Sequence, residues 1–337
     1  MSWVVAIAPD GLTAFSASIF GDILKIWDTG SGKELRTLTG HTNLVNAVAL
    51  APDGLTAISA SGDQTLKIWD IHNELRTPTD RTGSVKAVAI APDGKTAISA
   101  SNSDSLWQDH TFKIWDIDSG RELKTLIGHI GGQGAVAIAP DGKTAISTSS
   151  RDKTLKIWEI DSGRELKTLG RDQSWVLAVA IAPDGKTAIS AILASGDDTL
   201  KVWDTETGRE LKTLTGHSSG VKAVAIAPDG KTAISASRDH TLKIWDTETG
   251  SELKTLTGHS SWVNAVAIAP DGKTAISASN DTTMKIWDLL SGEEVATFSG
   301  DYGFNCCASA PDGVTVVAGD TSGRVHFLRL EGVSGRR

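Results

Sequence analysis

Hydrophobic and polar residues along this chain follow a pattern that repeats about every 42 residues, and residues 219–257 show it clearly. The period begins with a nearly continuous apolar run, 221–227, of small and β-branched residues, which is typical of a strand buried on both faces. It ends with residues 252–256, where apolar and polar residues alternate as in a strand with one solvated face. Two more strands are expected between them, at 232–237 and 241–245, separated by polar turns rich in Pro, Asp and Gly.

The tetrapeptide Ala-Pro-Asp-Gly marks the first turn of each period and occurs eight times, at intervals of 40 to 48 residues. Its alanines are Ala8, Ala51, Ala91, Ala139, Ala182, Ala227, Ala269 and Ala310. A unit of this size cannot bury an apolar face by itself, so neighbouring units must stack. Because four strands make one propeller blade, we predict an all-β propeller of eight blades.

Outer strands are expected only seven times, so the last blade is predicted to lack a clear outer strand. Seven blades plus an extra partial unit is the alternative. The expected blades of a single propeller over residues 1–330, with a tail at 331–337, are 3–38, 44–78, 84–126, 132–169, 175–214, 220–256, 262–298 and 304–330. Since no strand precedes the first blade, we expect the chain to be a fragment, or the C-terminal part, of a longer protein whose upstream residues supply a closing strand.

Composition narrows the class of protein. The net charge of the 337 residues is −8 and the pI is near 5.5, which argues against a nucleic-acid partner. The apolar runs are too short to span a bilayer, and the N-terminus lacks a secretory signal, so we expect no membrane partner. The only cysteines, Cys306 and Cys307, are adjacent; a redox pair is conceivable, but small strand residues are expected here. Few cysteines favour a cytoplasmic setting.

The best-preserved repeat carries Gly216-His217, Ser235-Ala236-Ser237, Asp239 and Trp245-Asp246. With these residues the chain resembles the WD40 repeat family, and the near-identity of its repeats resembles bacterial WD40 arrays, especially cyanobacterial ones. The resemblance covers about residues 3–330. It implies a β-propeller that acts by binding other proteins. The count of eight blades comes from the repeats themselves, and since no His pairs with Cys or Glu at metal spacing we expect neither a metal nor a cofactor.

In that family a His, a Ser, an Asp and a Trp form a buried hydrogen-bonded tetrad inside a blade. The resemblance implies three such structural tetrads here, His41-Ser59-Asp63-Trp69, His217-Ser235-Asp239-Trp245 and His259-Ser277-Asp281-Trp287. The same residue types could form a Ser/His/Asp catalytic triad. However, the set recurs in several blades, which a single active site would not do, so we interpret it as a buried network that fixes strand register.

Residues that vary between blades are the candidates for partner binding. Four tryptophans lie outside the third-strand pattern, and three of them share one register at the start of a first strand. In WD40 proteins that register faces the surface called the top. The predicted partner-binding residues of the top face are Trp3, Asn46, Lys86, Trp107, Arg151, Trp175, Lys222, Arg238, Trp262, Asn264 and Asn280. Trp with Arg, Lys and Asn is the composition of an interaction hot spot, and the basic members suit an acidic peptide.

Three classes of function remain. The first is a non-enzymatic protein-interaction scaffold or sensor with a protein or peptide partner, in which this chain is the C-terminal part of a larger signalling protein. The second is a small-ligand or glycan-binding propeller with a site in the central channel. The third is an enzyme built on the propeller, which would need carboxylates or histidines clustered in one or two blades, and the sequence shows no such cluster. We favour the first.

Overall fold

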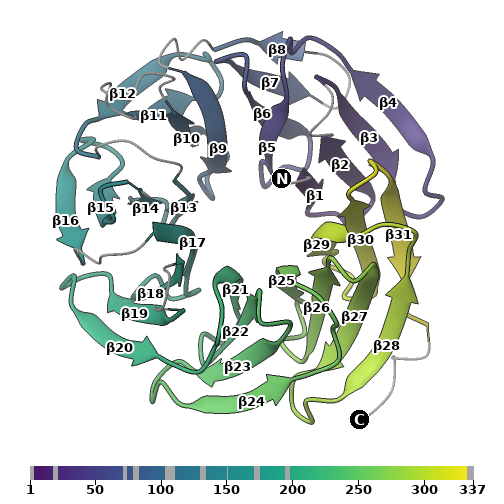
Figure 1. Cartoon of the computed structure of the whole chain (residues 1–337). Coiled ribbons are helices and arrows are strands. Elements are labelled where there is room, and N and C mark those ends of the chain that lie inside the picture. The colour runs from purple at the N-terminus through teal and green to yellow at the C-terminus, as the bar shows by residue number, and fades with distance from the viewer. Residues whose placement is uncertain are drawn as a thin grey trace.

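The computed structural model describes residues 4–17, 22–70, 74–78, 83–102, 111–129, 134–149, 151–170, 175–193 and 198–331. The described residues form strands and turns, without a helix, and the strands assemble into eight antiparallel sheets. Figure 1 shows these sheets arranged as blades around a common centre. The prediction of eight blades is confirmed, and seven sheets have four strands while the last has three.

Each blade follows the chain from the centre of the ring outward. Blades 1 to 4 consist of β1 (Val4–Ile7), β2 (Thr13–Ala17), β3 (Leu24–Asp28) and β4 (Glu34–Leu38); β5 (Val45–Leu50), β6 (Thr56–Ser61), β7 (Leu66–Asp70) and β8 (Glu74–Arg76); β9 (Ser84–Ile90), β10 (Thr96–Asn102), β11 (Thr111–Asp116) and β12 (Glu122–Leu126); and β13 (Val136–Ile138), β14 (Thr144–Thr148), β15 (Leu155–Glu159) and β16 (Glu165–Leu169).

The remaining blades repeat this arrangement until the last, which ends after its third strand. Blades 5 to 8 consist of β17 (Trp175–Ile181), β18 (Thr187–Leu193), β19 (Leu200–Asp204) and β20 (Glu210–Leu214); β21 (Val221–Ile226), β22 (Thr232–Ser237), β23 (Leu242–Asp246) and β24 (Glu252–Leu256); β25 (Val263–Ile268), β26 (Thr274–Ser279), β27 (Thr283–Asp288) and β28 (Glu294–Ser299); and β29 (Phe304–Ser309), β30 (Thr315–Asp320) and β31 (Val325–Arg329).

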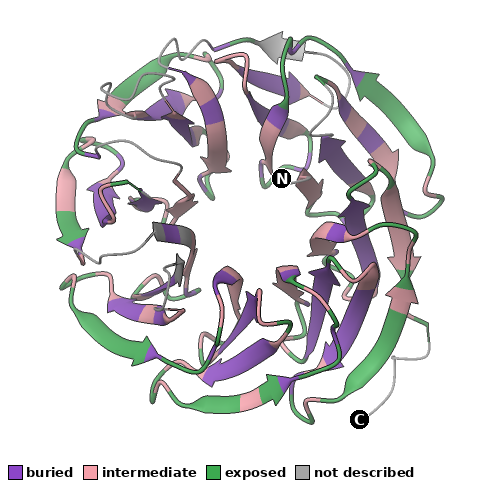
Figure 2. Cartoon of the chain, viewed as in Figure 1, coloured by how far each residue is buried: buried purple, intermediate pink, exposed green. Residues whose placement is uncertain are grey.

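Burial within a blade follows the sequence pattern. Strands β22 and β23 are almost entirely buried, whereas four of the five residues of β24 are at least partly exposed (Figure 2). The outer strand is tied to its neighbour by backbone pairing and by Lys243 Nζ, which donates to Glu252 Oε2 at 2.8 Å and to Thr255 Oγ1 at 2.7 Å. The outer strand therefore closes the sheet with charged residues that remain accessible to solvent.

The core lies between the blades. In the junction between blades 6 and 7, Leu256 of the outer strand packs beside Trp287 of the next blade, and both are at most 2% exposed. The same pairing of an outer-strand leucine with the next blade's tryptophan recurs as Leu38 with Trp69, Leu126 with Trp158, Leu169 with Trp203, and Leu214 with Trp245. Each blade thus completes its core only against its neighbour.

The junction between blades 8 and 1 differs from the other seven. Buried apolar clusters join blades 1 to 8 in succession, but among the described residues none joins blade 8 back to blade 1. Contact there includes Phe327, whose ring centroid lies 5.7 Å from that of Trp27, and the approach of β1 to β29 and β30. Trp27 is partly exposed, whereas the third-strand tryptophans of the next six blades are 1–3% exposed. We call this junction the seam.

Two leucines of one strand test the assignment of its faces. Leu256 is 2% exposed and Leu253 is 51% exposed, although both lie in β24. We expect Leu256→Ala to lower the free energy of unfolding by about 2–5 kcal/mol, because it leaves a cavity beside Trp287. Leu253→Ala is the matched control and should change it by less than about 0.5 kcal/mol. Urea denaturation followed by circular dichroism measures both, and similar losses would contradict the assignment.

Candidate functional site

A buried chain of hydrogen bonds links four residue types in blade 7. His259 Nδ1 lies 2.7 Å from Asp281 Oδ2, and His259 Nε2 lies 2.7 Å from Ser277 Oγ. Trp287 Nε1 donates to the same Ser277 Oγ at 2.8 Å. The network is consistent when Nδ1–H donates to the carboxylate and Ser277 O–H donates to Nε2, because every polar atom then has a partner.

Electrostatics agree with a neutral histidine and a charged aspartate. Burial lowers the pKa of His259 despite the raising effect of Asp281. Burial by itself would raise the pKa of Asp281, but hydrogen bonds from Thr283, the Ser260 N–H and His259 lower it to about 2. The folded blade therefore holds one carboxylate and one uncharged imidazole, with His259 buried and Asp281 partly buried.

The same network occurs in four blades within the described residues. Each has a His Nδ1–Asp contact of 2.7–2.8 Å, a His Nε2–Ser contact of 2.7 Å and a Trp Nε1–Ser bond of 2.7–2.8 Å. The sets are His41-Ser59-Asp63-Trp69, His129-Ser147-Asp152-Trp158, His217-Ser235-Asp239-Trp245 and His259-Ser277-Asp281-Trp287. The serines are 0–1% exposed and each accepts from a Trp N–H, so their oxygens offer no path to a substrate carbonyl.

Blade 8 contains a related contact that the sequence analysis missed. Asp320, which is fully buried, accepts from the backbone N–H groups of Ser322, Gly323 and Arg324, and lies 2.8 Å from His326 Nε2. The sequence signal was a pair of substitutions, because six of the other seven blades have a Ser where Asp320 stands and all seven have a Lys where His326 stands. This pair anchors the final hairpin in place of a full tetrad.

The top face carries the turns between the second and third strands of each blade, and two predicted residues meet there. The guanidinium carbon of Arg238, in blade 6, lies 4.9 Å from the centre of the Trp262 ring in blade 7. Trp262 is 44% exposed, so its other surface is open to a partner. This stacking joins residues that are 24 positions apart in the sequence, and it forms because neighbouring blades place these two positions side by side.

Lys222 adds a second positive charge beside this stack. Its pKa is lowered, mainly by burial and then by the charge of Arg238. Among the described residues neither Lys222 nor Arg238 forms an ion pair, and Arg238 Nε is buried without a hydrogen-bond partner. Two cations brought together without an acidic neighbour would gain from an anionic ligand. We call Lys222, Arg238 and Trp262 the cationic cluster.

Several predicted residues occupy β-bulges at the start of a first strand. Asn46, Lys86, Lys222 and Asn264 are each the extra residue where the register of the first strand shifts. Two of them connect blades: Asn46 Nδ2 donates to the carbonyl oxygen of Val85 at 2.8 Å, and Asn264 Nδ2 donates to that of Phe304 at 2.9 Å. Asn264 Nδ2 also donates to Asn280 Oδ1, at 2.6 Å. These amides are engaged within the propeller.

The other predicted residues are spread around the ring. Arg151 is exposed on the turn between β14 and β15, and Trp175 begins β17, with its side chain outside the described residues. Trp3 and Trp107 also lie outside the described residues. Only Lys222, Arg238, Trp262, Asn264 and Asn280, on blades 6 and 7, are brought into one neighbourhood by the described contacts.

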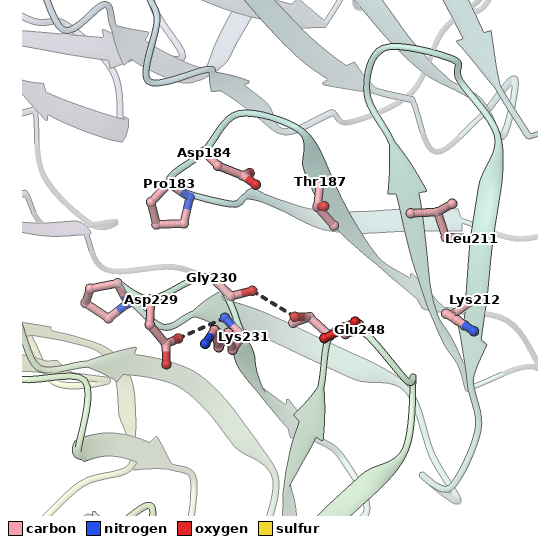
Figure 3. Close-up of a pocket in the computed structure, with 11 residues that line it drawn as sticks. Pro183, Asp184, Thr187, Leu211, Lys212, Asp229, Gly230, Lys231 and Glu248 are labelled. Carbon is pink, nitrogen blue, oxygen red and sulfur yellow. Dashed lines mark hydrogen bonds between the residues drawn. The ribbon is translucent and has the colours of Figure 1, made fainter.

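A separate cavity of about 820 Å³ lies between blades 5 and 6 on the opposite face (Figure 3). Its lining mixes the acidic Asp184, Asp229 and Glu248 with the basic Lys212 and Lys231. Most of these residues belong to the Pro-Asp-Gly turns and outer strands that recur in the other blades. The cavity therefore offers no chemistry that distinguishes one blade from another.

Other chemistries find little support in the described residues. Both cysteines are free and half-buried, and burial raises the pKa of Cys306 to about 12, so its thiol stays protonated near neutral pH. Within the described ranges no group of three or more His, Cys, Asp or Glu side chains could hold a metal ion. A helix of membrane-spanning length and hydrophobicity is likewise absent from the described part of the chain.

Comparisons with known proteins agree with the repeat pattern. The family described as "WD domain, G-beta repeat" matches residues 32–70, 73–116, 120–159, 163–204, 208–246 and 250–288. The crystal structure of the computationally designed Ika8 protein is similar, with a TM-score of 0.84 and 28% sequence identity over 98% of this chain and 96% of that chain. No curated protein sequence matches the chain significantly.

Removing the shared serine of one network tests its structural role. Ser277→Ala leaves the buried Trp287 N–H without an acceptor and His259 Nε2 without a partner, so we expect a loss of about 1–3 kcal/mol in the free energy of unfolding. Ser251→Ala, in an exposed turn, is the matched control and should have almost no effect. Chemical denaturation compares the variants, and equal midpoints would show that the network adds no stability.

The lowered pKa values predict how stability depends on pH. Below the ordinary pKa of 6.5, unfolded chains protonate their histidine while folded His259 resists protonation. Below 3.8 the unfolded aspartate takes up a proton while folded Asp281 remains charged down to about 2. Both effects act in the same direction, so stability is fully present above pH 6.5 and falls as the pH is lowered through these two windows.

The variant Asp281→Asn isolates the second window. Its melting temperature should be lower than that of the wild type at pH 7, and should change less between pH 4 and pH 2, because the titrating carboxyl is gone. Asp118→Asn, in an exposed turn, provides the control for loss of a negative charge. Calorimetry at several pH values measures this, and parallel curves for wild type and Asp281→Asn would contradict the assignment.

Proposed function

Because the chain belongs to the WD40 family, whose propellers commonly serve as protein-interaction scaffolds, we propose that it is a non-enzymatic scaffold that binds an acidic peptide segment on its top face. The observation that carries the proposal is the cationic cluster of Lys222, Arg238 and Trp262. It combines an exposed aromatic ring with two cations that form no ion pair among the described residues. Asn280 lies next to the cluster, because its backbone N–H donates to the carbonyl oxygen of Trp262 at 2.9 Å.

The proposal depends on the interactions that each residue of the cationic cluster can still form with a ligand. The Trp262 ring is held by Arg238 on one side and presents apolar area on the other, which is how an interface anchor is built. A carboxylate beside the Arg238 guanidinium would pair with a charge that has no ion-pair partner among the described residues. It would also favour the charged form of Lys222, which burial disfavours. Binding one acidic side chain would therefore reduce the mutual repulsion of the two cations.

The alternative of a small ligand or glycan at the centre of the ring has less support. The cavities at the blade 5/6 junction and at the seam lie between neighbouring blades and not at the centre. Protein binding also suits a ring whose polar frame is constant and whose top-face residues vary. We further propose a cytoplasmic location, since both thiols are free, and a role as one part of a larger signalling protein.

A labelled hexaglutamate peptide tests the cationic cluster directly. We expect it to bind the wild type more weakly as salt is raised, and a hexalysine peptide not to bind. Arg238→Ala and Trp262→Ala should each weaken binding by about tenfold or more. Arg209→Ala removes an exposed cation from a turn on the other face and is the matched control. Fluorescence anisotropy gives the affinities.

Two results would overturn the proposal. One is the absence of hexaglutamate binding to a wild-type protein whose melting temperature is normal. The other is an equal loss of affinity in Arg209→Ala and Arg238→Ala, which would mean that the overall charge of the protein, and not the cationic cluster, determines peptide binding. Circular dichroism of each variant shows whether the fold is retained.

A further inference from the structure

The last sheet has an outer edge that no described strand covers. Blade 8 has the order β29-β30-β31, and β31 ends the sheet. Leu330 N–H donates to Val314 C=O, and Arg324 C=O accepts from Asp320 N–H, so the even-numbered residues of β31 face β30. Because pairing alternates along an antiparallel strand, Val325, Phe327 and Arg329 turn their N–H and C=O groups outward.

The side chains at this edge show what the missing neighbour would cover. The third strand of blade 6 is buried at Leu242, Lys243, Ile244 and Trp245, whereas the four corresponding residues of β31 are only partly buried. Trp27, which faces blade 8 across the seam, is also partly exposed. In five other junctions an outer-strand leucine covers the corresponding tryptophan.

A third sign of incompleteness comes from the inner part of the seam. Asn305 occupies the same bulge position as Asn46 and Asn264, whose amides donate to the next blade. The Asn305 Nδ2 group is buried and has no hydrogen-bond partner. Among the described residues, the seam thus lacks the apolar cluster found at the other junctions and the amide bond found after blades 2 and 7.

Two cavities lie along β31, one toward each end. The first, of about 490 Å³, is lined by residues that include Lys25, Trp27 and Val325. The second, of about 310 Å³, is lined by residues that include Gly32, Phe327 and Arg329. In the second cavity the Phe327 ring lies against Gly32, which has φ of +67° and would bring a Cβ within 3.5 Å of that ring. In blade 7, Gly292 instead faces Lys254 and Leu256 of an outer strand.

The outer strands of the other blades show which sequence pairs with a third strand at this position. Four of its outer strands have the sequence Glu-Leu-Lys-Thr-Leu, at 122–126, 165–169, 210–214 and 252–256. Paired with β31 as these strands pair in their own blades, bulge included, this sequence places its leucine opposite Val325, next to Trp27, and its glutamate opposite Leu328, adjacent to Arg329. Arg329 is exposed and forms no close ion pair within the described residues, although its charge lowers the pKa of Asp312, so an acidic residue beside it would gain a favourable interaction.

We propose that the outer edge of β31 binds an extended segment of a separate polypeptide, which carries an acidic residue four positions before a leucine. Added as a fourth strand, the segment pairs with three outward N–H groups and covers Trp27. The tail 332–337 has neither an acidic residue nor a leucine, so its sequence does not fit. A second copy does not fit either, because its four Glu-Leu-Lys-Thr-Leu segments already pair within its own blades.

A synthetic peptide with the sequence of residues 250–258, Gly-Ser-Glu-Leu-Lys-Thr-Leu-Thr-Gly, is the probe. Hydrogen exchange by NMR reads the amides of Val325, Phe327 and Arg329 one by one in the full-length chain. At a peptide concentration of about ten times the Kd, these three amides should exchange about tenfold more slowly, while the outer strands of the other blades do not change. The same peptide with Leu256→Asp should give no protection.

Variants of the protein localise the site. Arg329→Pro removes one outward N–H but keeps the bonds to β30, so it should abolish the protection. Arg329→Ala keeps the backbone and removes only the charge, and should weaken binding by about two- to fivefold. Amide exchange in β27 reports whether each variant retains its fold.

Three outcomes would overturn the proposal. The first is unchanged exchange at Val325, Phe327 and Arg329 in wild-type protein saturated with the probe up to millimolar concentration. The second is equal protection by the Leu256→Asp peptide or in Arg329→Pro. The third is a wild-type dimer, seen by light scattering, that Arg329→Pro converts to a monomer, since a second copy would then occupy the edge. Hexaglutamate binding at the cationic cluster is measured separately, so the two proposals can fail independently.

Discussion

The packing of each blade's tryptophan under the leucine of the blade before it is the interaction on which the propeller depends. A single blade of small and β-branched residues has two apolar faces and no means of covering either. The packing of Leu256 over Trp287, and of the corresponding residues at other junctions, lets each blade cover an apolar face of its neighbour. The arrangement can end only when the last blade returns to the first, so closure is decided by the seam, where Phe327 meets Trp27 without an outer-strand leucine beside them.

Apolar packing alone would not fix how the strands slide along one another, and the tetrads provide that constraint. Ser277 accepts from Trp287 on the neighbouring strand and contacts His259, which precedes the blade, so three segments are held in one register. Because every member is satisfied, burial of these polar groups costs little and specifies much. The His, Asp and Ser of each tetrad are arranged much like a catalytic triad. A catalytic serine must be accessible to a substrate, whereas the tetrad serine is buried, so accessibility distinguishes the structural arrangement from the catalytic one.

The sequence predicted the architecture well because the repeat contains its own evidence. Eight Ala-Pro-Asp-Gly turns and seven outer strands with a leading glutamate led to eight blades and a three-stranded last sheet. Contacts between blades were harder to predict. Asn46 and Asn264 donate to the next blade, and Arg238 stacks on Trp262. These contacts depend on β-bulges and on the rotation between neighbouring blades, and the sequence pattern contains neither. The His326–Asp320 pair was missed because it departs from the repeat.

Those departures are informative, since a repetitive frame cannot by itself be specific. At the bulge position Asn46 and Asn264 tie one blade to the next, while Lys222 in the same register supplies a cation with a lowered pKa instead. The two buried side-chain atoms without a partner in the described structure, Arg238 Nε and Asn305 Nδ2, lie at the cationic cluster and at the seam. An unsatisfied buried polar atom lowers stability, and these two lie at the two places where we propose that a partner binds. Departures from the rules that stabilise the rest of a fold are expected at functional sites.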